Sequence, residues 1–328
     1  MILAGDIGGT KTRLALYERD ARRLTLLACE SYPSRAHPDL ESILRIFLAA
    51  RGARVEAAAF GIAGPVRDGR CETTNLAWVV DARHLAPVLG LAAVGLVNDL
   101  VANASGLAEL GPDDLAVLNE GSPGAGGNSA MISAGTGLGE AGLVWDGRRH
   151  LPFDSEGGHA SFAPTDEIEV AVYHYLRSRF GHVSWERVLS GPGLVNLYSF
   201  LRDTGQEEEP EWLRERLAQG DAAAAISEEA QEGRSALCAR ALDLFVRLYG
   251  AEAGNVALKF MATGGVYVGG GIAPKIIGRL RAPGFMERFA DKGRMRRLLE
   301  SMPVRVVLND RTALLGAARL ALDAASAG

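Results

Sequence analysis

Three glycine-rich segments have the composition of turns that bind phosphate, and the first of them also holds a carboxylate. This segment, Gly5-Asp-Ile-Gly-Gly-Thr-Lys-Thr12, joins small residues and hydroxyl groups to Asp6 at the end of a predicted strand. Backbone N–H groups of glycine turns bind phosphate oxygens, and hard divalent cations bind carboxylate and water oxygens. The segment matches neither the G-x-x-x-x-G-K-[ST] nor the G-x-G-x-x-G motif. Taken alone, it fits either a phosphate and metal site or a tight hairpin.

The other two glycine turns favour the first interpretation. They are Ile132-Ser-Ala-Gly-Thr-Gly-Leu-Gly139 and Gly269-Gly-Gly-Ile-Ala-Pro274, and each follows a short apolar run typical of a buried strand. Three such turns with few bulky neighbours are more than hairpins require. Together they predict a bound nucleotide, with the second turn on its phosphates and the third against its adenosine.

An amide and a carboxylate, Asn98 and Asp99, follow the apolar run Ala92–Val97. The ends of buried strands are where α/β folds present groups that bind ligands. The competing interpretation is that Asp99 only caps the helix that follows it.

Groups suited to a sugar occur in two further segments. Glu156 and His159 stand three residues apart in Asp154-Ser-Glu-Gly-Gly-His159, and Glu186 precedes another pair of glycines. A hexose presents hydroxyls that both donate and accept, so carboxylates, amides and a histidine would fix its orientation. Taken singly, each of these residues is better explained as a surface or turn residue. A zinc site at His159 is disfavoured because no cysteine or second histidine lies at ligand spacing.

The elements that must position these residues alternate along the first hundred positions. Apolar periodicity predicts strands over 1–6, 12–17, 24–30, 55–62 and 92–97, with helices over 38–50 and 82–89. This alternation indicates an α/β layer fold. Strands over 130–134 and 140–145 around the second glycine turn repeat the opening, which suggests an internally duplicated fold, although so short a similarity can also arise by chance.

The rest of the chain is predicted to be a second, helix-rich lobe. Helices are expected over 167–180 and 191–202 and within the Ala- and Glu-rich region 211–261. They are followed by a strand over 265–268, a helix over 274–280, a strand over 304–308 and a last helix over 312–324.

Composition excludes several classes of protein. The 328 residues carry 40 acidic and 35 basic side chains and are 48% hydrophobic, which is neither disordered, fibrous nor membrane-spanning. This length predicts two domains. Cys29, Cys71 and Cys238 are too few and too scattered for a disulfide framework. No basic segment followed by an apolar one opens the chain, so we expect a cytoplasmic protein.

The basic run Arg288-x3-Lys292-x-Arg294-x-Arg296-Arg297 is the one concentration of positive charge. Glu287, Asp291 and Glu300 are interleaved with it, and the whole chain has a net charge of −5. We therefore predict a solvated helix face and no nucleic-acid site.

The motifs occur in an order that resembles the bacterial ATP-dependent glucokinases of the hexokinase and actin superfamily. Each motif is weak alone, but their joint order over essentially the whole chain is specific. The motifs are Gly5-Asp-x-Gly-Gly-Thr10, Ala63-Gly-Pro65, Thr74-Asn-Leu-x-Trp78, Asn98-Asp99, Gly135-Thr-Gly-Leu-Gly139, Glu156-Gly-Gly-His159, Glu186-x-Val-Leu-Ser-Gly-x-Gly193 and Gly269-Gly-Gly-Ile-x-Pro274.

This resemblance implies a two-lobed, ribonuclease-H-like α/β fold. The small domain would comprise 1–110 with 310–328, and the large domain 111–309 with helical insertions. It also implies a transferase, commonly a homodimer, that phosphorylates the 6-hydroxyl of glucose with Mg-ATP and feeds glycolysis. The two joints near 100–120 and 305–312 would form the hinge of a closure that keeps water away from the phosphoryl group.

Residue roles follow from the same resemblance. Asp99 matches the catalytic base, and Asp6 would hold Mg²⁺ through water. The implied sugar contacts are Asn75, Asn98, Asp99, Glu156, His159 and Glu186. The implied nucleotide contacts are Gly5, Asp6, Gly8, Gly9, Thr10, Gly135, Thr136, Gly137, Gly269, Gly270 and Gly271.

Related sugar kinases carry a cysteine-rich zinc motif after their Glu-x-Gly-His segment, whereas Ala160-Ser-Phe-Ala-Pro164 here has no cysteine. This departure favours the zinc-free type. The rival classes are a kinase of mannose or an amino sugar, a sugar-sensing regulator and an actin-like assembly protein. The choice among glucose, mannose and glucosamine stays open, because it depends on contacts at the 2-position.

Overall fold

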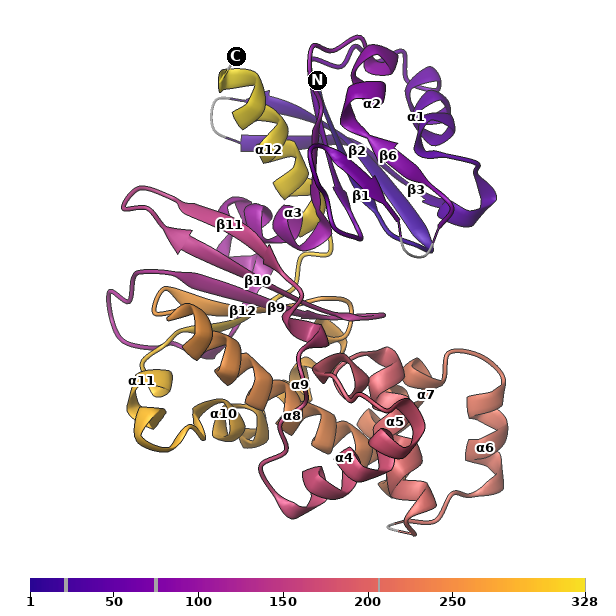
Figure 1. Ribbon diagram of the computed structural model, residues 1–328, viewed down its shortest axis with the longest axis vertical. Coiled ribbons are helices and arrows are strands. Elements are labelled where there is room, and N and C mark those ends of the chain that lie inside the picture. The colour runs from indigo at the N-terminus through magenta and orange to yellow at the C-terminus, as the bar shows by residue number, and fades with distance from the viewer. Residues whose placement is uncertain (21–22, 74–75, 206, 328) are drawn as a thin grey trace. The chain divides into compact units, whose positions relative to one another are not determined.

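The computed structural model describes residues 1–327 except 21–22, 74–75 and 206, and it contains two large mixed sheets flanked by helices (Figure 1). The chain forms two compact units. The first comprises residues 1–114, 149–154 and 309–328, and the second comprises 115–148 and 155–308. These units differ from the expected domain boundaries in the segment 149–154 and by up to four residues at the junctions.

The first unit is built on a sheet with the strand order β3-β2-β1-β4-β7. Strand β1 pairs antiparallel with β2 and parallel with β4, and β4 pairs parallel with β7. The carboxyl ends of β1, β4 and β7 therefore lie at one edge of the sheet. The bounds are β1 (Ile2–Ile7), β2 (Lys11–Asp20), β3 (Arg23–Pro33), β4 (Ala57–Ile62) and β7 (Gly95–Asn98).

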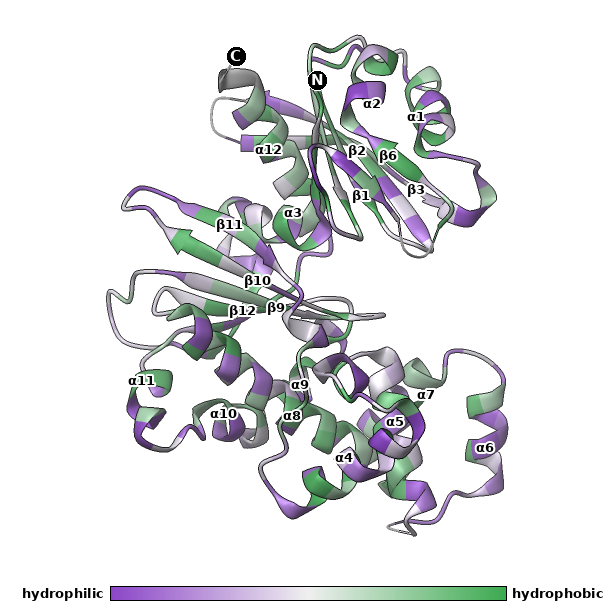
Figure 2. Ribbon diagram, in the orientation of Figure 1, coloured by the Kyte–Doolittle hydropathy of each residue, from purple (hydrophilic) through white to green (hydrophobic). Residues whose placement is uncertain are grey.

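Alternating side chains of β1 enter two different cores. Leu3 and Ile7 pack with α1 (Leu40–Ala49), whereas Ile2 and Ala4 pack with α12 (Thr312–Ala327). This alternation is the expected result of the period-2 geometry of a strand. Helix α1 carries both hydrophobic and hydrophilic residues along its length, as an amphipathic helix must (Figure 2).

Smaller elements complete the first unit. Helix α1 begins two residues later than predicted because the carboxylate of Asp39 accepts from the backbone N–H of Ser42 and caps it. The two-stranded sheet of β5 (Arg70–Glu72) and β6 (Val79–Asp81) was not predicted from the sequence. The remaining helices are α2 (Ala82–Leu89) and α3 (Asp99–Gly106).

The large sheet of the second half of the chain has the order β11-β10-β9-β12-β13-β8. Strand β9 pairs antiparallel with β10 and parallel with β12, which is parallel to β13. The run β11-β10-β9-β12-β13 thus repeats the order β3-β2-β1-β4-β7, as the predicted duplication requires. The bounds are β8 (Leu115–Asn119), β9 (Ser129–Ala134), β10 (Leu138–Trp145), β11 (His150–Ser155), β12 (Gly265–Gly269) and β13 (Val304–Val307).

Most helices of the second unit pack against the 25-residue helix α8 (Ala236–Phe260). The predicted helical region 211–261 divides into three helices because Asp221 and Ser235 act as N-caps. No helix of the described residues is long and apolar enough to cross a membrane. The other helices are α4 (Glu167–Phe180), α5 (Gly191–Asp203), α6 (Glu211–Ala218), α7 (Ala222–Gln231), α9 (Ile277–Leu280), α10 (Pro283–Ala290) and α11 (Arg296–Glu300).

The prediction of one solvated helix face for the basic run is wrong in part. Arg288 pairs with Glu169, which is only 1% exposed, and the Lys292 ammonium donates to the carbonyl of Ala251 at 2.9 Å. The run also spans α10, a 3-10 turn and α11 rather than one helix. Its first two cations therefore join helices, and only the later arginines are exposed.

Helices α3 and α12 approach each other through glycines. A Cβ atom on Gly316 would lie 1.8 Å from the carbonyl oxygen of Ala102, and one on Gly106 would lie 2.0 Å from that of Thr312. These contacts involve backbone atoms that cannot rotate away. The close crossing holds α3 against the sheet and so positions the residues at its N-terminus.

We expect Gly316→Ala to lower the free energy of unfolding by about 1–3 kcal/mol, because the added methyl group would overpack this crossing. Urea unfolding followed by circular dichroism measures the effect. Gly278→Ala on α9 is the control, since a methyl group there would have no atom of the described residues within 4 Å. Equal stability of the two variants would contradict the proposed role of the crossing.

Candidate active site

The first glycine turn joins β1 to β2 and is held by a serine from outside the hairpin. The N–H of Gly8 donates to the carbonyl of Lys11 at 3.0 Å. The Ser34 hydroxyl donates to the carbonyl of Gly8 at 2.8 Å and lies 2.9 Å from the hydroxyl of Thr12. Gly9 and Thr10 form the tip, where Thr10 is exposed. This is a fixed turn with an accessible tip, as an anion site requires.

Asp6 lies just before this turn, beside Gly61 of β4. Burial raises the pKa of its carboxyl group, although the charges of Arg13 and Lys11 oppose the shift. A divalent cation would reverse this shift, since a nearby positive charge favours the ionised carboxylate. Among the described residues there is no cluster of three or more His, Cys, Asp or Glu side chains that could hold a metal. A single carboxylate beside a glycine turn is compatible with Mg²⁺, which commonly uses one or two carboxylates together with waters and substrate phosphates.

Asn98 and Asp99 occupy the junction between β7 and α3. The side-chain oxygen of Asn98 accepts from the N–H of Leu100 at 2.8 Å, and its amide nitrogen donates to the carbonyl of Gly64 at 3.2 Å. Asn98 is therefore the N-cap, and it also ties the turn after β4 to the end of β7. Asp99 is the first residue of the helix, with its Oδ1 3.0 Å from the same N–H. Asn98 therefore holds the N-cap position, and Asp99 also accepts from a backbone N–H of the first turn.

Close backbone packing brings Asp99 to the edge where β1 and β4 end. A Cβ atom on Gly61 would lie 3.5 Å from the Cα of Asp99 and 3.8 Å from the carbonyl oxygen of Gly5. Burial, and then the charge of Asp99, raise the pKa of the neighbouring Cys71 thiol. The first unit therefore gathers Asp6, the first glycine turn and Asp99 at one edge of its sheet.

The second glycine turn joins β9 to β10 in the other sheet. The N–H of Gly135 donates to the carbonyl of Gly137 at 2.8 Å, and the N–H of Gly191 donates to the carbonyl of Gly135 at 2.8 Å. The second of these bonds ties the N-terminus of α5 to the turn. Thr136 is exposed at the tip, as Thr10 is in the first turn.

The side chain of Tyr249 on α8 links the segments that lead into the second and third glycine turns by hydrogen bonds. Its buried hydroxyl accepts from the N–H of Ala134 at 3.1 Å and lies 3.1 Å from the carbonyl of Gly269, to which it can donate. Gly270 has a φ of 84°, and a Cβ atom there would lie 2.2 Å from the carbonyl oxygen of Ala134. The third turn, Gly269–Gly271, therefore lies directly against the end of β9.

Glu156 and His159 are both exposed on a short 3-10 turn, η4 (Gly157–His159). Their charged atoms, Glu156 Oε2 and His159 Nε2, are 3.9 Å apart. The chain after this turn bonds to a second 3-10 turn, η5 (Trp185–Arg187), through the Trp185 N–H and the Ala160 carbonyl at 3.0 Å. The structure thus brings η4 and η5 together although some 25 residues separate them.

Glu186, a predicted sugar contact, faces the second glycine turn. Its Oε2 accepts from the N–H of Leu138 at 3.0 Å, and a Cβ atom on Gly137 would lie 2.5 Å from that oxygen. One carboxylate oxygen of Glu186 therefore holds the second glycine turn in place through a hydrogen bond. Asn75, another predicted sugar contact, lies outside the described residues.

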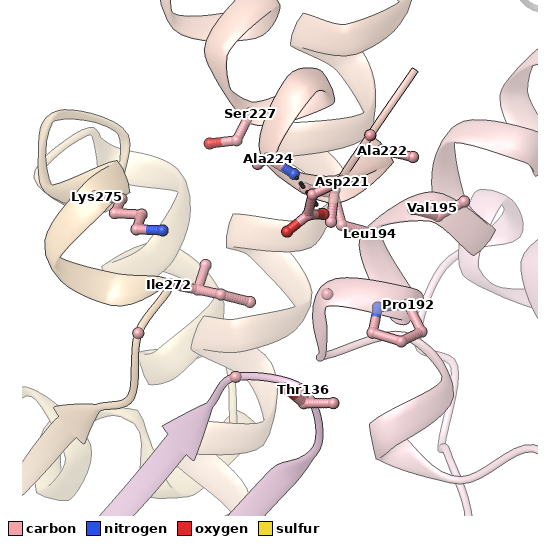
Figure 3. A pocket seen from close by; sticks show the side chains of 15 residues that line it. Thr136, Pro192, Leu194, Val195, Asp221, Ala222, Ala224, Ser227, Ile272 and Lys275 are labelled. Carbon is pink, nitrogen blue, oxygen red and sulfur yellow. Dashed lines mark hydrogen bonds between the residues drawn. The ribbon is translucent and has the colours of Figure 1, made fainter. Parts of the chain in front are cut away.

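A pocket of about 550 Å³ opens between the second and third glycine turns and helices α5 and α7. Thr136 and Ile272 come from the two turns, and Pro192 comes from α5 (Figure 3). Asp221, Ser227 and Lys275 add polar groups around the same space (Figure 3). Sequence analysis missed these three residues. Asp221 has the pattern of an N-cap, but nothing in that pattern indicates that α7 lies beside the glycine turns.

Comparisons with known proteins identify the family of this chain. The family model described as Glucokinase matches residues 3–324. The chain belongs to the glucokinase family. A glucokinase of Synechocystis sp. is 43% identical over 96% of this chain and 96% of its own length. The crystal structure of a glucokinase from an Antarctic psychrotroph superposes with a TM-score of 0.84 at 31% identity, covering 98% of both chains.

A more distant structure shares the fold. It is a ROK family glucokinase from Streptomyces griseus in complex with glucose and AMPPNP, with a TM-score of 0.67 at 24% identity over 98% of this chain and 99% of the other. Membership of the glucokinase family confirms the predicted two-lobed fold of actin and hexokinase and the predicted class of enzyme, an ATP-dependent hexose kinase.

We expect Tyr249→Phe to lower the stability of this glucokinase-family chain by about 1–3 kcal/mol, because the N–H of Ala134 would lose its buried partner. The KM for ATP should rise more than the KM for glucose, since both affected turns line the pocket. Urea unfolding and steady-state kinetics measure the two effects.

The control for this variant is Tyr173→Phe, whose hydroxyl accepts from the exposed Arg177 at 3.3 Å and from no other side chain in the described part of the chain. Its stability should stay within about 0.5 kcal/mol of the wild type. A Tyr249→Phe protein with wild-type stability and an unchanged KM for ATP would show that the tyrosine does not support the turns.

Proposed function

We propose that this chain is a glucokinase that transfers the γ-phosphoryl group of Mg-ATP to the 6-hydroxyl of D-glucose. The products are glucose 6-phosphate and ADP, and the reaction supplies glycolysis. The observation that carries the proposal is the pocket at two glycine turns in a chain 43% identical, over nearly its whole length, to a named glucokinase.

The pocket supports the choice of a nucleotide as phosphoryl donor. Ligand sites are concave and mostly apolar, with a few polar groups that fix orientation. Ile272 and Val195 supply apolar walls, while Asp221 and Ser227 supply polar groups around the pocket (Figure 3). In the proposal the adenosine occupies this space, Gly269–Gly271 contact it, and the N–H groups of Gly135–Gly137 bind phosphate oxygens.

The first unit is proposed to contribute the remaining phosphate and metal groups. Gly5, Gly8, Gly9 and Thr10 bind phosphate oxygens through the turn, and Asp6 holds Mg²⁺ through water. When bound, Mg²⁺ neutralises negative charge on the phosphate oxygens. The partly buried position of Asp6 strengthens its interaction with a cation, because charges interact more strongly away from water.

Asp99 is proposed to act on the sugar hydroxyl. A free aspartate has a pKa of about 3.9, so it is a weak base toward an alcohol in the ground state. We therefore assign it two tasks: it orients the hydroxyl, and it accepts the proton late, as the oxygen bonds to phosphorus. In phosphoryl transfer, positioning and charge stabilisation supply most of the catalysis.

The other sugar contacts are proposed to orient the ring. They are Asn75 and Asn98 in the first part of the chain, and Glu156, His159 and Glu186 in the second unit. The exposed Glu156 and His159 present an acceptor and a group that can donate or accept. Glu186 keeps one oxygen for the sugar, since the other binds the N–H of Leu138.

We also propose that the enzyme is a cytoplasmic homodimer without zinc. Family resemblance supports the assembly and the compartment, and the lack of cysteine in Ala160–Pro164 supports the absence of zinc. Light scattering after size exclusion and elemental analysis of the purified protein test these points.

We expect Asp99→Asn to lower kcat by about 10²–10⁴-fold, because it removes the general base while keeping the shape of the side chain. The KM for glucose should change little. A coupled assay of ADP release with Mg-ATP measures this for glucose, mannose, fructose, glucosamine and N-acetylglucosamine.

The matched control is Asp113→Asn, an exposed carboxylate on a 3-10 turn of the same unit. It should keep the wild-type kcat. Wild-type turnover that is highest with another sugar of the panel would revise the acceptor. The absence of any sugar-dependent turnover in a folded sample would favour a sugar sensor.

We expect Ser227→Phe to raise the KM for ATP by about tenfold or more, because a large side chain would fill the pocket that is proposed to bind adenosine. The KM for glucose should stay unchanged. Ser227→Ala, which leaves the space open, should behave nearly like the wild type. Equal KM values for ATP in both variants would place the nucleotide elsewhere.

A further inference from the structure

Two buried acids lie close together beneath the proposed sugar-binding turn and have no part in the mechanism above. Glu140 is on β10 and Glu252 is on α8, and they are 1% and 0% exposed. Their carboxyl groups interact electrostatically. Two ionised carboxylates in a buried site repel each other, so the pair favours a state in which one of them holds a proton.

The partners of the two acids indicate where the proton lies. Glu252 Oε2 accepts from the side-chain amide of Asn255 at 2.7 Å, and its Oε1 accepts from the ammonium of Lys259 at 3.2 Å. Glu140 Oε1 is buried without a donor among the described residues. Because an unpaired buried charge is costly, the favoured state is an ionised Glu252 beside a neutral Glu140.

The electrostatics agree with this assignment. Burial, followed by the charge of Glu252, raises the pKa of Glu140 to about 8, and Lys259 opposes the shift. Burial also raises the pKa of Glu252, but Asn255 and Lys259 favour its ionised form. At neutral pH the pair therefore keeps one proton, which resides on Glu140.

Glu140 also touches the turn that carries Glu156 and His159. A Cβ atom on Gly157 would lie 2.0 Å from Glu140 Oε2, so only a glycine allows η4 to approach this carboxyl group. The next residue, Gly158, lies against the carbonyl oxygen of Leu138, where a Cβ atom would be 2.1 Å away. The 3-10 turn therefore rests on β10, and its first residue rests on Glu140.

We propose that Glu140 is a positioning residue for sugar binding: its neutral carboxyl group, paired with Glu252, supports Gly157 and so holds Glu156 and His159 in place. When the proton leaves, two carboxylates repel each other under the turn and displace it. This inference rests on the proposed function, because it takes Glu156 and His159 to be sugar contacts.

Other charged groups surround the pair. Lys259 faces it from α8, and Lys292 faces Glu252 from the segment after α10. Burial lowers the pKa of Lys292. Glu156 and His159 lie at the two ends of the η4 turn itself. Glu186 accepts from the N–H of Leu138, which lies on the same strand as Glu140. The test must therefore isolate the contribution of Glu140 from that of these neighbouring groups.

The experiment measures the KM for glucose and kcat between pH 6.5 and 9.5. In the wild type we expect the KM to rise by about tenfold with a midpoint near pH 8, since a displaced binding group costs at least this much. Saturating glucose should largely restore kcat. Glu140→Gln is neutral at every pH and should keep a flat KM.

Two further variants sharpen the test. Glu252→Gln removes the neighbouring charge, so the midpoint should move to lower pH. Glu169→Gln, which alters an equally buried carboxylate on α4, is the matched control and should keep the wild-type midpoint.

Thermal unfolding provides a readout that does not depend on activity. The pKa of Glu140 is raised from its ordinary 4.5 to about 8, so the folded state holds the proton more tightly than the unfolded state. The wild type should therefore lose stability relative to Glu140→Gln as the pH rises from about 5 to about 8, and the difference should level off above that.

The outcomes separate the two proposals. If the wild type turns over glucose but Glu140→Gln shows the same alkaline rise in KM, the positioning role is overturned and another group causes the rise. If the wild type shows no glucose-dependent turnover, the proposed function fails and the positioning role fails with it. A stability difference that does not vary with pH would also overturn the neutral state of Glu140.

Discussion

Parallel strand pairing is the constraint on which the functional residues depend. Parallel strands end at the same edge of a sheet, so the turns that follow them must lie side by side. In the first unit this edge collects the turn after β1 and Asp99 after β7. In the second it collects the glycine turns after β9 and β12. Functional residues that lie far apart in the sequence are thereby brought together in two small regions of the structure.

Glycine permits the close approach, and polar side chains then hold the turns in place. Ser34 bonds the first turn, Glu186 the second, and Tyr249 joins the second to the third. Each of these side chains satisfies backbone groups that would otherwise be buried without partners. Turns held in this way need less ordering when a phosphate binds, which favours binding.

Several fully buried polar groups of the second unit lie under the proposed binding loops. Tyr249 lies beneath the nucleotide turns, and the Glu140 and Glu252 pair lies beneath the turn of Glu156 and His159. Buried polar networks are rigid when every member has a partner. In the acid pair two like charges are avoided only while one proton is present, so in our proposal the support of the sugar loop depends on pH in a way that the support of the nucleotide turns does not.

Local pattern alone determined much of this protein. The alternation of strands and helices, the three glycine turns and the ordered motifs led to the α/β fold, to the family and to residues such as Asp6 and Asp99, because these signals lie within short stretches of chain. Tertiary packing decided the rest. It tied the Asn98 amide to the carbonyl of Gly64, turned Glu186 toward a backbone N–H 48 residues away, paired Arg288 with Glu169, and placed Asp221 and Ser227 beside the glycine turns. Such contacts join segments far apart in the chain, and sequence spacing carries no information about which buried surfaces will meet.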